Sequence, residues 1–448
     1  MSTQKPPGYG SRITQRERQA FQVAGLVTDM RRRTGLGLVV VFVALAALVG
    51  VGMALAGGGE LTEQWVSDTP RDNRVNHHAV GVGPDGAVIV APVAEVPNSD
   101  VRITNTSCAL VRLAPTDSST MWRTGVPADA CFTHALTEPA IEDVDSDGSP
   151  EVIVSSTEDA LIAYSATDGS EAWRVSLPTY GYGRPTVANV TSAAGPEIVT
   201  SDIRGNVAVV HGNGTVAWRV ALNDTRWSRA SVWDAPVVSD IDADGSPEVF
   251  VGTSRGGVLL GGNGTVEWQE NGSARDVATA QIDDDSAIEL FTSGTATLRA
   301  YDGQTGEIEW RRNLSNTRLR TATDGDGDGA AELYVGQSGR FLTLDAQSGE
   351  TEWATTVSDS DDVSPTAPVL GDVNGDGQRE LVGVLNTGRV AVLDAESGSE
   401  LAVYERDVPV WTFPTVRDID SDGAAEILVR YGDGRVVRLD YSSSGLIR

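Results

Sequence analysis

Acidic side chains recur along the chain in an arrangement suited to holding a hard cation. The segment DVDSDGSPE, from Asp143 to Glu151, places carboxylates at positions 1, 3, 5 and 9 and glycine at position 6. Calcium takes roughly six to eight oxygen ligands, and alternating aspartates turn three carboxylates toward one concavity. The spacing therefore predicts a calcium loop, completed by a backbone carbonyl near position 7 and by the carboxylate at position 9.

Four further copies of this loop begin at Asp240, Asp324, Asp372 and Asp418, so we predict about five calcium sites. The predicted ligands are Asp143, Asp145, Asp147 and Glu151; Asp240, Asp242, Asp244 and Glu248; Asp324, Asp326, Asp328 and Glu332; Asp372, Asn374, Asp376 and Glu380; and Asp418, Asp420, Asp422 and Glu426. An EF-hand is excluded, because its last carboxylate stands at position 12 and helices flank it. The alternative is a set of solvated acidic turns without metal.

Two loops are degenerate. The loop from Gln281 keeps three acidic ligands but has serine where glycine is expected, and it remains a weaker candidate with Asp283, Asp285 and Glu289. The loop from Asn189 keeps Glu197 but has Thr191 and Ala193 at positions 3 and 5. We expect no metal there, which implies that individual repeats fold without one.

The acidic loops belong to a longer repeat. Their last acids, from Glu151 to Glu426, follow one another at intervals of 41 to 51 residues, and tryptophans keep a similar spacing. This period is typical of propeller blades or helical solenoids. Residues 139–177 contain four short β-type runs separated by Gly/Asp turns, without a helical period. The predicted fold is therefore an all-β propeller with four strands per blade.

The repeats predict eight blades. Seven carry the acidic loop or its remnant, and an eighth, Ala87 to Gly125, lies upstream without it. The last repeat lacks a tryptophan strand, whereas Leu61 to Trp65 supplies one at the start. We expect this first strand to complete the last blade. Seven blades is the alternative if the first repeat is an insertion.

The repeats resemble those of two known families. The Asp-x-Asp-x-Asp-Gly-x-x-Glu loops resemble the FG-GAP repeats of integrin α-chain propellers. Segments such as ALIAYSATDGSEAW and TLRAYDGQTGEIEW resemble the repeats of pyrroloquinoline-quinone-type (PQQ-type) eight-bladed propellers. Together the resemblances cover residues 62–448 and imply a calcium-binding propeller. They say little about function, since such propellers host enzymes, scaffolds and adhesins.

Propeller topology places the connections between blades on the face opposite the acidic loops. These connections are rich in aromatic and arginine side chains, which are enriched in binding sites. The residues predicted to bind a partner there are Tyr180, Tyr182, Arg184, Trp227, Trp233 and Trp411. Packing that fills the central channel is the alternative.

The N-terminal segment predicts a membrane anchor. Residues 35–57 are apolar and uncharged over a length that spans a bilayer, and residues 1–34 carry seven basic against two acidic side chains. The positive-inside rule then places the tail in the cytoplasm and residues 58–448 outside as an extracellular propeller. A cleaved signal peptide ending near Ala56 is the alternative.

Other features agree with an external location. Cys108 and Cys131 are the only cysteines, and we expect a disulfide between them, with two free thiols as the alternative. Asn-x-Ser/Thr triplets predict glycosylation, each only weakly, at Asn105, Asn189, Asn213, Asn223, Asn263, Asn271 and Asn313. The net charge of −29, with arginine at all but one of the 34 basic positions, is typical of haloarchaeal, salt-tolerant surfaces and disfavours nucleic acid as a partner.

These features predict a binding, adhesion or surface-assembly module for a protein or glycan partner. We expect no enzymatic activity, because the four histidines form no nucleophile or zinc pattern. A quinoprotein-type oxidoreductase is one alternative, although Cys108 and Cys131 are not the adjacent pair that the resemblance to such enzymes would imply. A scaffold subunit of a membrane complex is the other.

Overall fold

The computed structural model describes residues 58–71, 76–97, 102–224, 229–283, 285–360, 363–364 and 366–443. The chain divides into Met1–Gly58 and Gly59–Arg448. The predicted basic tail and membrane span, residues 1–57, lie outside the described part. Within that part, no helix has both the length and the apolar character needed to cross a bilayer.

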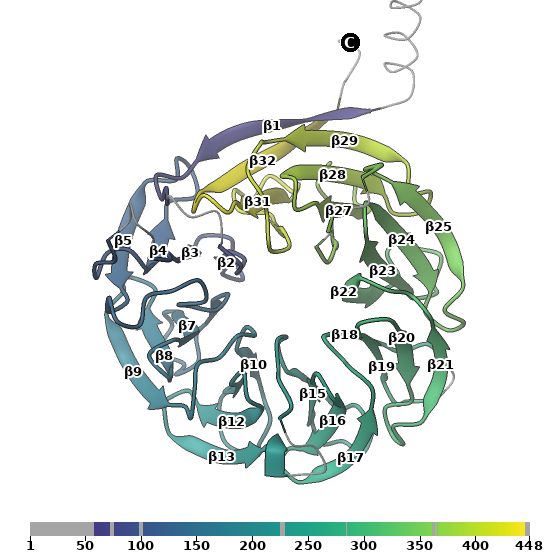
Figure 1. The fold of residues 1–448 in the computed structure, drawn as a ribbon, viewed down its shortest axis with the longest axis horizontal. Helices are drawn as coiled ribbons and strands as arrows, with labels where there is room; N and C mark the ends of the chain where they lie inside the picture. Colours follow the sequence, from purple (N-terminus) through teal and green to yellow (C-terminus); the bar gives the residue numbers. More distant parts are fainter. Residues whose placement is uncertain are drawn as a thin grey trace, which may run out of the picture. The chain divides into compact units, whose positions relative to one another are not determined.

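Residues Gly59–Ser443 form eight four-stranded antiparallel sheets arranged as blades around an axis (Figure 1). The strands of the first four blades, from the innermost to the outermost, are β2 (Gly81–Val82), β3 (Ile89–Val93), β4 (Ala109–Leu113) and β5 (Thr120–Gly125) in blade 1; β6 (Ala140–Glu142), β7 (Glu151–Ser156), β8 (Ala160–Ser165) and β9 (Glu171–Ser176) in blade 2; β10 (Thr186–Ala188), β11 (Glu197–Ser201), β12 (Asn206–His211) and β13 (Val216–Ala221) in blade 3; and β14 (Val237–Ser239), β15 (Glu248–Gly252), β16 (Gly256–Gly261) and β17 (Val266–Asn271) in blade 4.

The other four blades follow the same plan. Their strands are β18 (Asp276–Ala280), β19 (Glu289–Ser293), β20 (Leu298–Tyr301) and β21 (Ile308–Arg312) in blade 5; β22 (Thr317–Thr323), β23 (Glu332–Gln337), β24 (Arg340–Asp345) and β25 (Thr351–Thr356) in blade 6; β26 (Val369–Gly371), β27 (Glu380–Val384), β28 (Arg389–Asp394) and β29 (Glu400–Glu405) in blade 7; and β30 (Thr415–Arg417), β31 (Glu426–Arg430), β32 (Val436–Ser443) and β1 (Gly59–Val66) in blade 8. One short 3-10 helix, η1 (Leu222–Asp224), follows β13.

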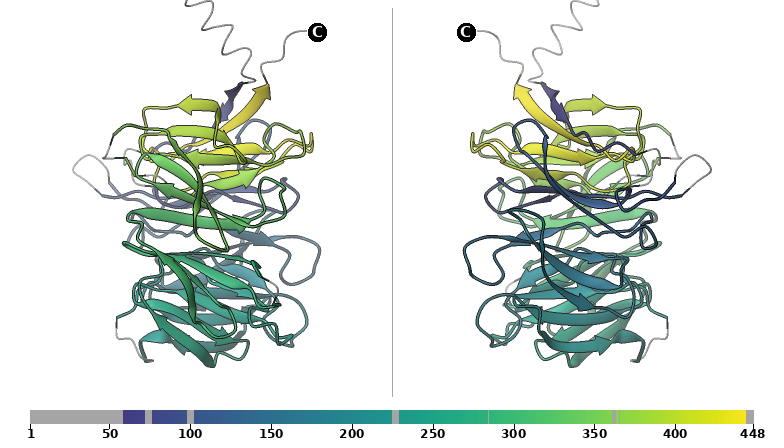
Figure 2. Two further views of the ribbon diagram at one scale, coloured as in Figure 1. Left: turned by 90° about the vertical axis from the view of Figure 1, so that its right-hand side faces the viewer. Right: turned by 90° about the vertical axis from the view of Figure 1, so that its left-hand side faces the viewer.

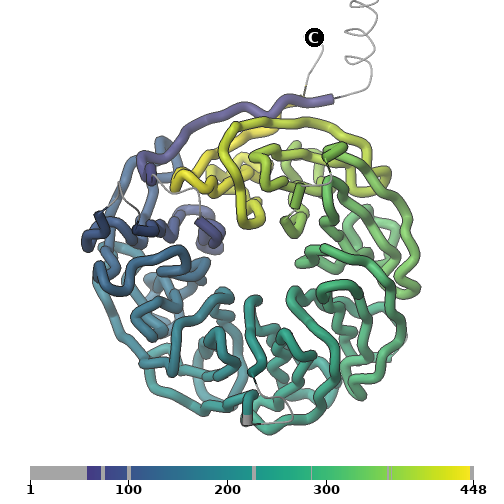
Figure 3. Tube along the Cα trace, in the orientation of Figure 1, coloured from purple at the N-terminus to yellow at the C-terminus, as the bar shows by residue number. Residues whose placement is uncertain are grey.

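The two ends of the propeller meet in blade 8. Strand β1 pairs antiparallel with β32, with Leu61 opposite Tyr441 and Trp65 opposite Arg438. The tube in Figure 3 shows the chain passing once around the ring before the last blade meets the first strand. The predictions of eight blades and of circular closure are therefore confirmed, and the upstream repeat is a blade rather than an insertion.

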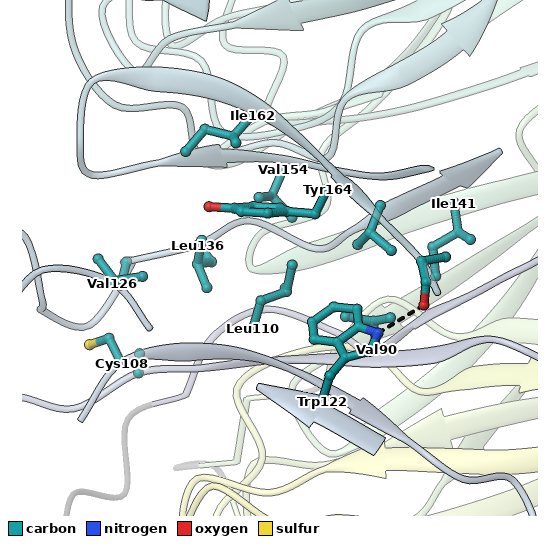
Figure 4. Close-up of a cluster of buried hydrophobic side chains, with 14 of the residues drawn as sticks. Val90, Cys108, Leu110, Trp122, Val126, Leu136, Ile141, Val154, Ile162 and Tyr164 are labelled. Carbon is teal, nitrogen blue, oxygen red and sulfur yellow. Dashed lines mark hydrogen bonds between the residues drawn. The ribbon is translucent and has the colours of Figure 1, made fainter. Parts of the chain in front are cut away.

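The core lies between neighbouring blades. In blade 2 the two middle strands β7 and β8 are almost entirely buried, whereas most residues of the outermost strand β9 are exposed. Because both faces of a middle strand pack against a sheet, apolar residues follow one another without alternation at 152–154 in β7 and at 160–164 in β8. Figure 4 shows one such interface, where Val90 and Leu110 of blade 1 meet Val154 and Ile162 of blade 2. The side views in Figure 2 show the blades packed around the ring.

The periodic tryptophans fasten each blade to the next. Seven of them donate an indole N–H to a backbone carbonyl of the following blade at 2.8–3.0 Å; the donors are Trp65, Trp122, Trp173, Trp218, Trp268, Trp310 and Trp353. Figure 4 shows the bond from Trp122 to the carbonyl of Ala166. At the junction of blades 7 and 8 the outer strand has no tryptophan, and Tyr404 donates instead to Glu63 of β1 at 2.6 Å. The repeat period in the sequence is thus the period of an inter-blade bond.

The expected disulfide is present. Cys108 and Cys131 are joined, with their Cα atoms 5.4 Å apart. Cys108 precedes β4, and Cys131 lies in the connection between blades 1 and 2. The bond therefore ties this connection to the first blade.

Candidate functional site

The acidic loops all connect the first strand of a blade to its second, so they share one face of the propeller. In five loops, carboxylate oxygens from three or four side chains lie within 4.8 Å of one another. The groups are Asp143, Asp145 and Glu151; Asp240, Asp242 and Glu248; Asp283, Asp285 and Glu289; Asp324, Asp326, Asp328 and Glu332; and Asp418, Asp420 and Glu426. The loop from Gln281, predicted to be degenerate, is therefore assembled like the well-formed ones.

The predicted ligands at position 5 differ between loops. All four aspartates, Asp147, Asp244, Asp328 and Asp422, accept a hydrogen bond from the backbone N–H two residues downstream, but among them Asp328 alone also belongs to the carboxylate group of its loop in the described residues. The Asp372 loop forms no group of acids of this kind among the described residues. There Asn374 turns its Nδ2 toward Glu380 Oε1 at 2.6 Å, and Asp376 accepts a bond from Gln378.

The glutamate at position 9 has a role that sequence reasoning missed. In all seven loops its Oε2 accepts a hydrogen bond from the backbone N–H at position 2, at 2.7–3.1 Å. The glutamates are Glu151, Glu197, Glu248, Glu289, Glu332, Glu380 and Glu426. Because Glu197 makes this bond in the loop that has lost its aspartates, the glutamate closes the loop independently of any metal.

The loops differ in the partners of the second carboxylate oxygen, Oε1, of these glutamates. Oε1 of Glu289 and Oε1 of Glu332 are buried and have no hydrogen-bond partner among the described residues. A buried carboxylate oxygen without a partner is costly, and a cation bound to it would remove that cost. Burial also raises the pKa of Glu289 to about 7, helped by the charge of Asp283. The donor sets of these two loops fit a hard cation.

Two other loops supply their own partners for the glutamate. In the loop from Asn189, Glu197 Oε1 accepts a bond from Thr191 Oγ1 at 2.5 Å and lies 3.4 Å from His211 Nδ1. In the last loop the guanidinium of Arg438 reaches Asp420 at 2.6 Å and Glu426 at 2.9 Å. The Asp418 loop, predicted as a calcium site from its sequence, thus already holds a positive charge.

On the opposite face the innermost ends of several blades surround a cavity of about 500 Å³. Its lining comes from blade-to-blade connections, from second-to-third-strand hairpins and from the first residues of the innermost strands β18 and β22, so it lies on the face opposite the acidic loops. Aromatic, basic and acidic side chains dominate it: His77, His78, Tyr182, Trp233, Trp411 and Phe413; Arg184, Arg275, Arg318 and Arg320; and Glu138, Asp234 and Asp276. Aromatic and charged groups that converge in one concave site are typical of ligand recognition.

Three of the four arginines of this cavity pair with carboxylates of its wall. Arg318 lies 3.2 Å from Asp276, and Glu138 lies 3.6 Å from Arg320 and 3.9 Å from Arg184. Asp276 also accepts a bond from Ser293 at 2.6 Å. The paired carboxylates are thus anchored in the cavity wall.

Aromatic rings lie against two of these guanidinium groups. Arg320 stands 3.8 Å from the ring centroid of Phe413, and Arg275 stands 5.6 Å from that of Trp233. Cation–π contacts of this kind fix the plane of the guanidinium.

Three histidines gather at one side of the cavity. The ring of His134 lies 4.9 Å from His77 and 5.6 Å from His78, and Tyr182 contacts His78 and His134. Burial lowers the pKa of His134 to about 4, with a further contribution from His77, and lowers the pKa of His78 and of His77. These rings are therefore neutral near pH 7. They do not appear among the residue groups with metal-binding geometry in the described chain.

Most of the predicted partner-binding residues reach this cavity. Tyr182, Arg184, Trp233 and Trp411 line it. Tyr180 instead packs edge-on against Phe132, with ring centroids 5.7 Å apart, and Trp227 lies outside the described residues.

Sequence reasoning missed the arginines and acids at the entrances of the innermost strands. Arg275 directly precedes β18, and Arg318 and Arg320 lie in β22. The usable signal was their position: they lie at or near the start of an innermost strand, on the same face as the blade-to-blade connections that supplied the aromatic residues.

The predicted glycosylation sites are mostly exposed. Asn105, Asn213, Asn263, Asn271 and Asn313 are exposed. The side chain of Asn223 is half-buried, accepts a bond from Ala230 and donates one to the carbonyl of Arg204. Its amide is thus already engaged within the fold.

Comparison with known proteins identifies the family. A family model described as outer membrane protein assembly factor BamB matches residues 106–276 and 203–444. The chain belongs to this BamB family of PQQ-type propellers. That assignment confirms the PQQ-type part of the resemblance seen in the sequence, while the FG-GAP part stays a prediction. Among curated proteins, none matches the chain.

Solved structures share the BamB-family fold at low identity. BamB from Moraxella catarrhalis is 17% identical, with a TM-score of 0.56 over 86% of this chain and 99% of the other. The quinohemoprotein alcohol dehydrogenase ADHIIG from Pseudomonas putida HK5 is 12% identical, with a TM-score of 0.62 over 87% of this chain and 77% of the other. BBS1N, crystallised in complex with ARL6DN, is 14% identical, with a TM-score of 0.50 over 69% and 93%. At these identities the likeness concerns the fold alone.

Proposed function

We propose that this BamB-family propeller is a binding module whose protein or glycan partner engages the central cavity opposite the acidic loops. The observation that carries the proposal is the lining of that cavity, where four arginines and several aromatic rings converge. Arginine, tryptophan and tyrosine are the residue types that dominate binding energy at interfaces. A protein partner would also agree with BBS1N, whose structure was determined in complex with ARL6DN.

We propose calcium as the resident ion of the acidic loops. The best candidates are the loops closed by Glu289 and Glu332, where a carboxylate oxygen is buried without a hydrogen-bond partner. The loops closed by Glu151 and Glu248 have three carboxylates close enough to bind it. When bound, the ion neutralises the clustered carboxylates and stiffens the loop. Its role is structural, since the loops lie on the face away from the cavity.

The location follows the sequence prediction. We propose that residues 35–57 anchor the chain in the cell membrane and that the propeller lies outside the cell. Protease added to intact cells tests this: the propeller should be degraded while residues 1–34 stay protected. Protection of the propeller from the protease would contradict the proposed orientation.

The binding proposal is tested by affinity capture with the full-length protein in detergent, using wild type and Trp411→Ala. Trp411 lines the cavity and is 43% exposed, so the removal of its side chain should lower partner capture about tenfold without unfolding the propeller. Met121→Ala on the outer strand β5 is the matched control, because Met121 is also exposed and lies far from the cavity in its blade. Equal capture by wild type and Trp411→Ala would contradict a cavity-centred site.

The second candidate is a quinoprotein-type oxidoreductase, favoured by the fold shared with the alcohol dehydrogenase ADHIIG. Against it, the two cysteines are 23 residues apart and joined across a connection rather than adjacent. Adding pyrroloquinoline quinone to the purified protein separates the two candidates, since an oxidoreductase should bind it with a change in absorbance. A third candidate, a scaffold subunit, predicts that deletion of residues 1–34 abolishes assembly into a membrane complex.

A further inference from the structure

We infer that the central cavity recognises a carboxylate-bearing carbohydrate, namely a short uronic-acid segment of an acidic polysaccharide. The inference rests on the proposed function, because it names the chemical class of the ligand at the same site. The inference is supported by which charged side chains are exposed to the cavity and which are buried in its wall.

The arginine side chains are more exposed to the cavity than the carboxylates that pair with them. The side chains of Arg184, Arg318 and Arg320 are 35%, 38% and 27% exposed. Their partners Glu138 and Asp276 are only 11% and 7% exposed. A molecule that enters the cavity therefore meets guanidinium groups first, although the chain as a whole carries a net charge of −29. A local reversal of charge in a strongly acidic protein favours an anionic ligand.

The third acid of the lining, Asp234, does not change this. Asp234 accepts bonds from the backbone N–H groups of Ala235 at 2.9 Å and Val277 at 3.1 Å, so it joins blade 4 to blade 5 within the wall. Arg275 meanwhile lies over Trp233, which leaves its N–H edge oriented by stacking rather than by a carboxylate. An oriented guanidinium edge is suited to a bidentate bond with a carboxylate.

The remaining lining suits the body of a sugar. Trp411 presents an exposed indole at the cavity, held by stacking on His77 at 5.9 Å with an interplanar angle of 23°. An indole face packs on the apolar C–H face of a pyranose ring, because both surfaces are flat and apolar. Hydroxyl and amide groups that can bond to sugar hydroxyls stand around the cavity: Ser315, Asn316, Thr317, Ser364 and Asn386.

The cavity is less suited to an acidic peptide. Peptides are commonly bound by an open strand edge, by an apolar groove or, where the motif is acidic, by an arginine cluster. The apolar residues of the lining, Ala79, Ala367 and Val410, are all buried and offer no pocket for an apolar side chain. The arginines would suit either class, and we assign the carbohydrate because Trp411 exposes an indole face in the cavity.

Titration calorimetry on the full-length protein in detergent tests the inference. The probes are trigalacturonic acid, its methyl ester, which has the same rings without charge, and poly-glutamate, which has the charge without rings. We expect heat of binding from the acid only, and at least a tenfold loss of affinity in Arg275→Gln and in Trp411→Ala. Arg174→Gln is the control, because Arg174 pairs with Glu158 and Glu171 on the outer part of blade 2. Circular dichroism confirms that each variant is folded.

The outcomes separate this inference from the proposed function. Equal binding of the ester would overturn the role of charge, and equal or tighter binding of poly-glutamate would overturn the choice of carbohydrate. If no probe binds while partner capture still depends on Trp411, the carbohydrate inference fails and the binding proposal stands. If partner capture is insensitive to Trp411, the binding proposal itself fails.

Discussion

The indole of Trp310 in blade 5 lies directly on Gly349 in blade 6, so close that a Cβ at Gly349 would stand 2.9 Å from the ring. Gly349 also has a positive φ of 69°. The same pairing of a tryptophan with a glycine of the next blade occurs at Gly169, Gly214, Gly264, Gly306 and Gly398. In these six junctions the Gly turn and the tryptophan of the sequence repeat are thus the two sides of one inter-blade contact.

Replacing Gly349 by alanine should destabilise the propeller by about 2–4 kcal/mol, because a left-handed backbone and a clash with Trp310 act together. The matched control is Gly195→Ala, where φ is 86° but no atom lies within 4 Å of the added carbon. It should cost only the backbone strain of about 1–2 kcal/mol. Urea unfolding of both variants measures the difference, and equal losses would show that the tryptophan contact adds nothing.

Removing calcium should lower the melting temperature of the protein, and Glu332→Gln should reduce that change. Each occupied site contributes about 1.4 kcal/mol at a tenfold excess of ion over Kd. Glu197→Gln serves as the control, since Thr191 and His211 already surround that carboxylate. Thermal melts with calcium and with chelator measure the effect. An unchanged melting temperature of the wild type on chelation would refute the metal assignment.

Arg438 should act as a built-in cation of the last loop. Its side chain is 9% exposed and contacts Asp420, Glu426 and Asp440. In Arg438→Met these acids lose their partner, which should cost roughly 3 kcal/mol in the absence of calcium. Added calcium should recover more stability in the variant than in wild type, because the emptied loop can then bind an ion. If calcium stabilises both proteins equally, Arg438 does not occupy a cation site.

The architecture was predictable because its signals are periodic. The tryptophans that begin with Trp65 and the glutamates from Glu151 to Glu426 recur at intervals of one blade. The last repeat has no tryptophan strand, which indicated that the first strand of the chain completes it. The structure confirms the eight blades, the closing strand and the disulfide.

The site was predictable only in part. The loops were read residue by residue, so the long-range contact of Arg438 with Glu426, from the neighbouring strand, was not visible in the motif. Likewise, Arg320 and Glu138 are far apart in sequence, and only the ring brings them together as a pair in one cavity. Charge pairing across blades depends on tertiary structure, whereas the local turn chemistry of the loops does not.

The buried histidines should make the propeller less stable in acid. Burial lowers the pKa of His134 to about 4, whereas an unfolded histidine titrates near roughly 6.5. As the pH falls from about 6.5 to about 4, His134 becomes protonated in the unfolded state but stays neutral in the folded state. The free energy of unfolding therefore decreases. Above about pH 6.5 this histidine has no effect.

His134→Gln removes this group, so the variant should lose less stability than wild type on going from pH 7.5 to pH 5. Because His134 is partly exposed, we expect a difference of about 1 kcal/mol at pH 5 after allowing for solvent screening. Asp234 works in the opposite direction, since burial and the charge of Asp276 raise its pKa to about 6. It is present in both proteins, so urea unfolding of the pair at each pH isolates the histidine. Parallel pH profiles would mean that His134 takes up its proton equally readily in the folded state.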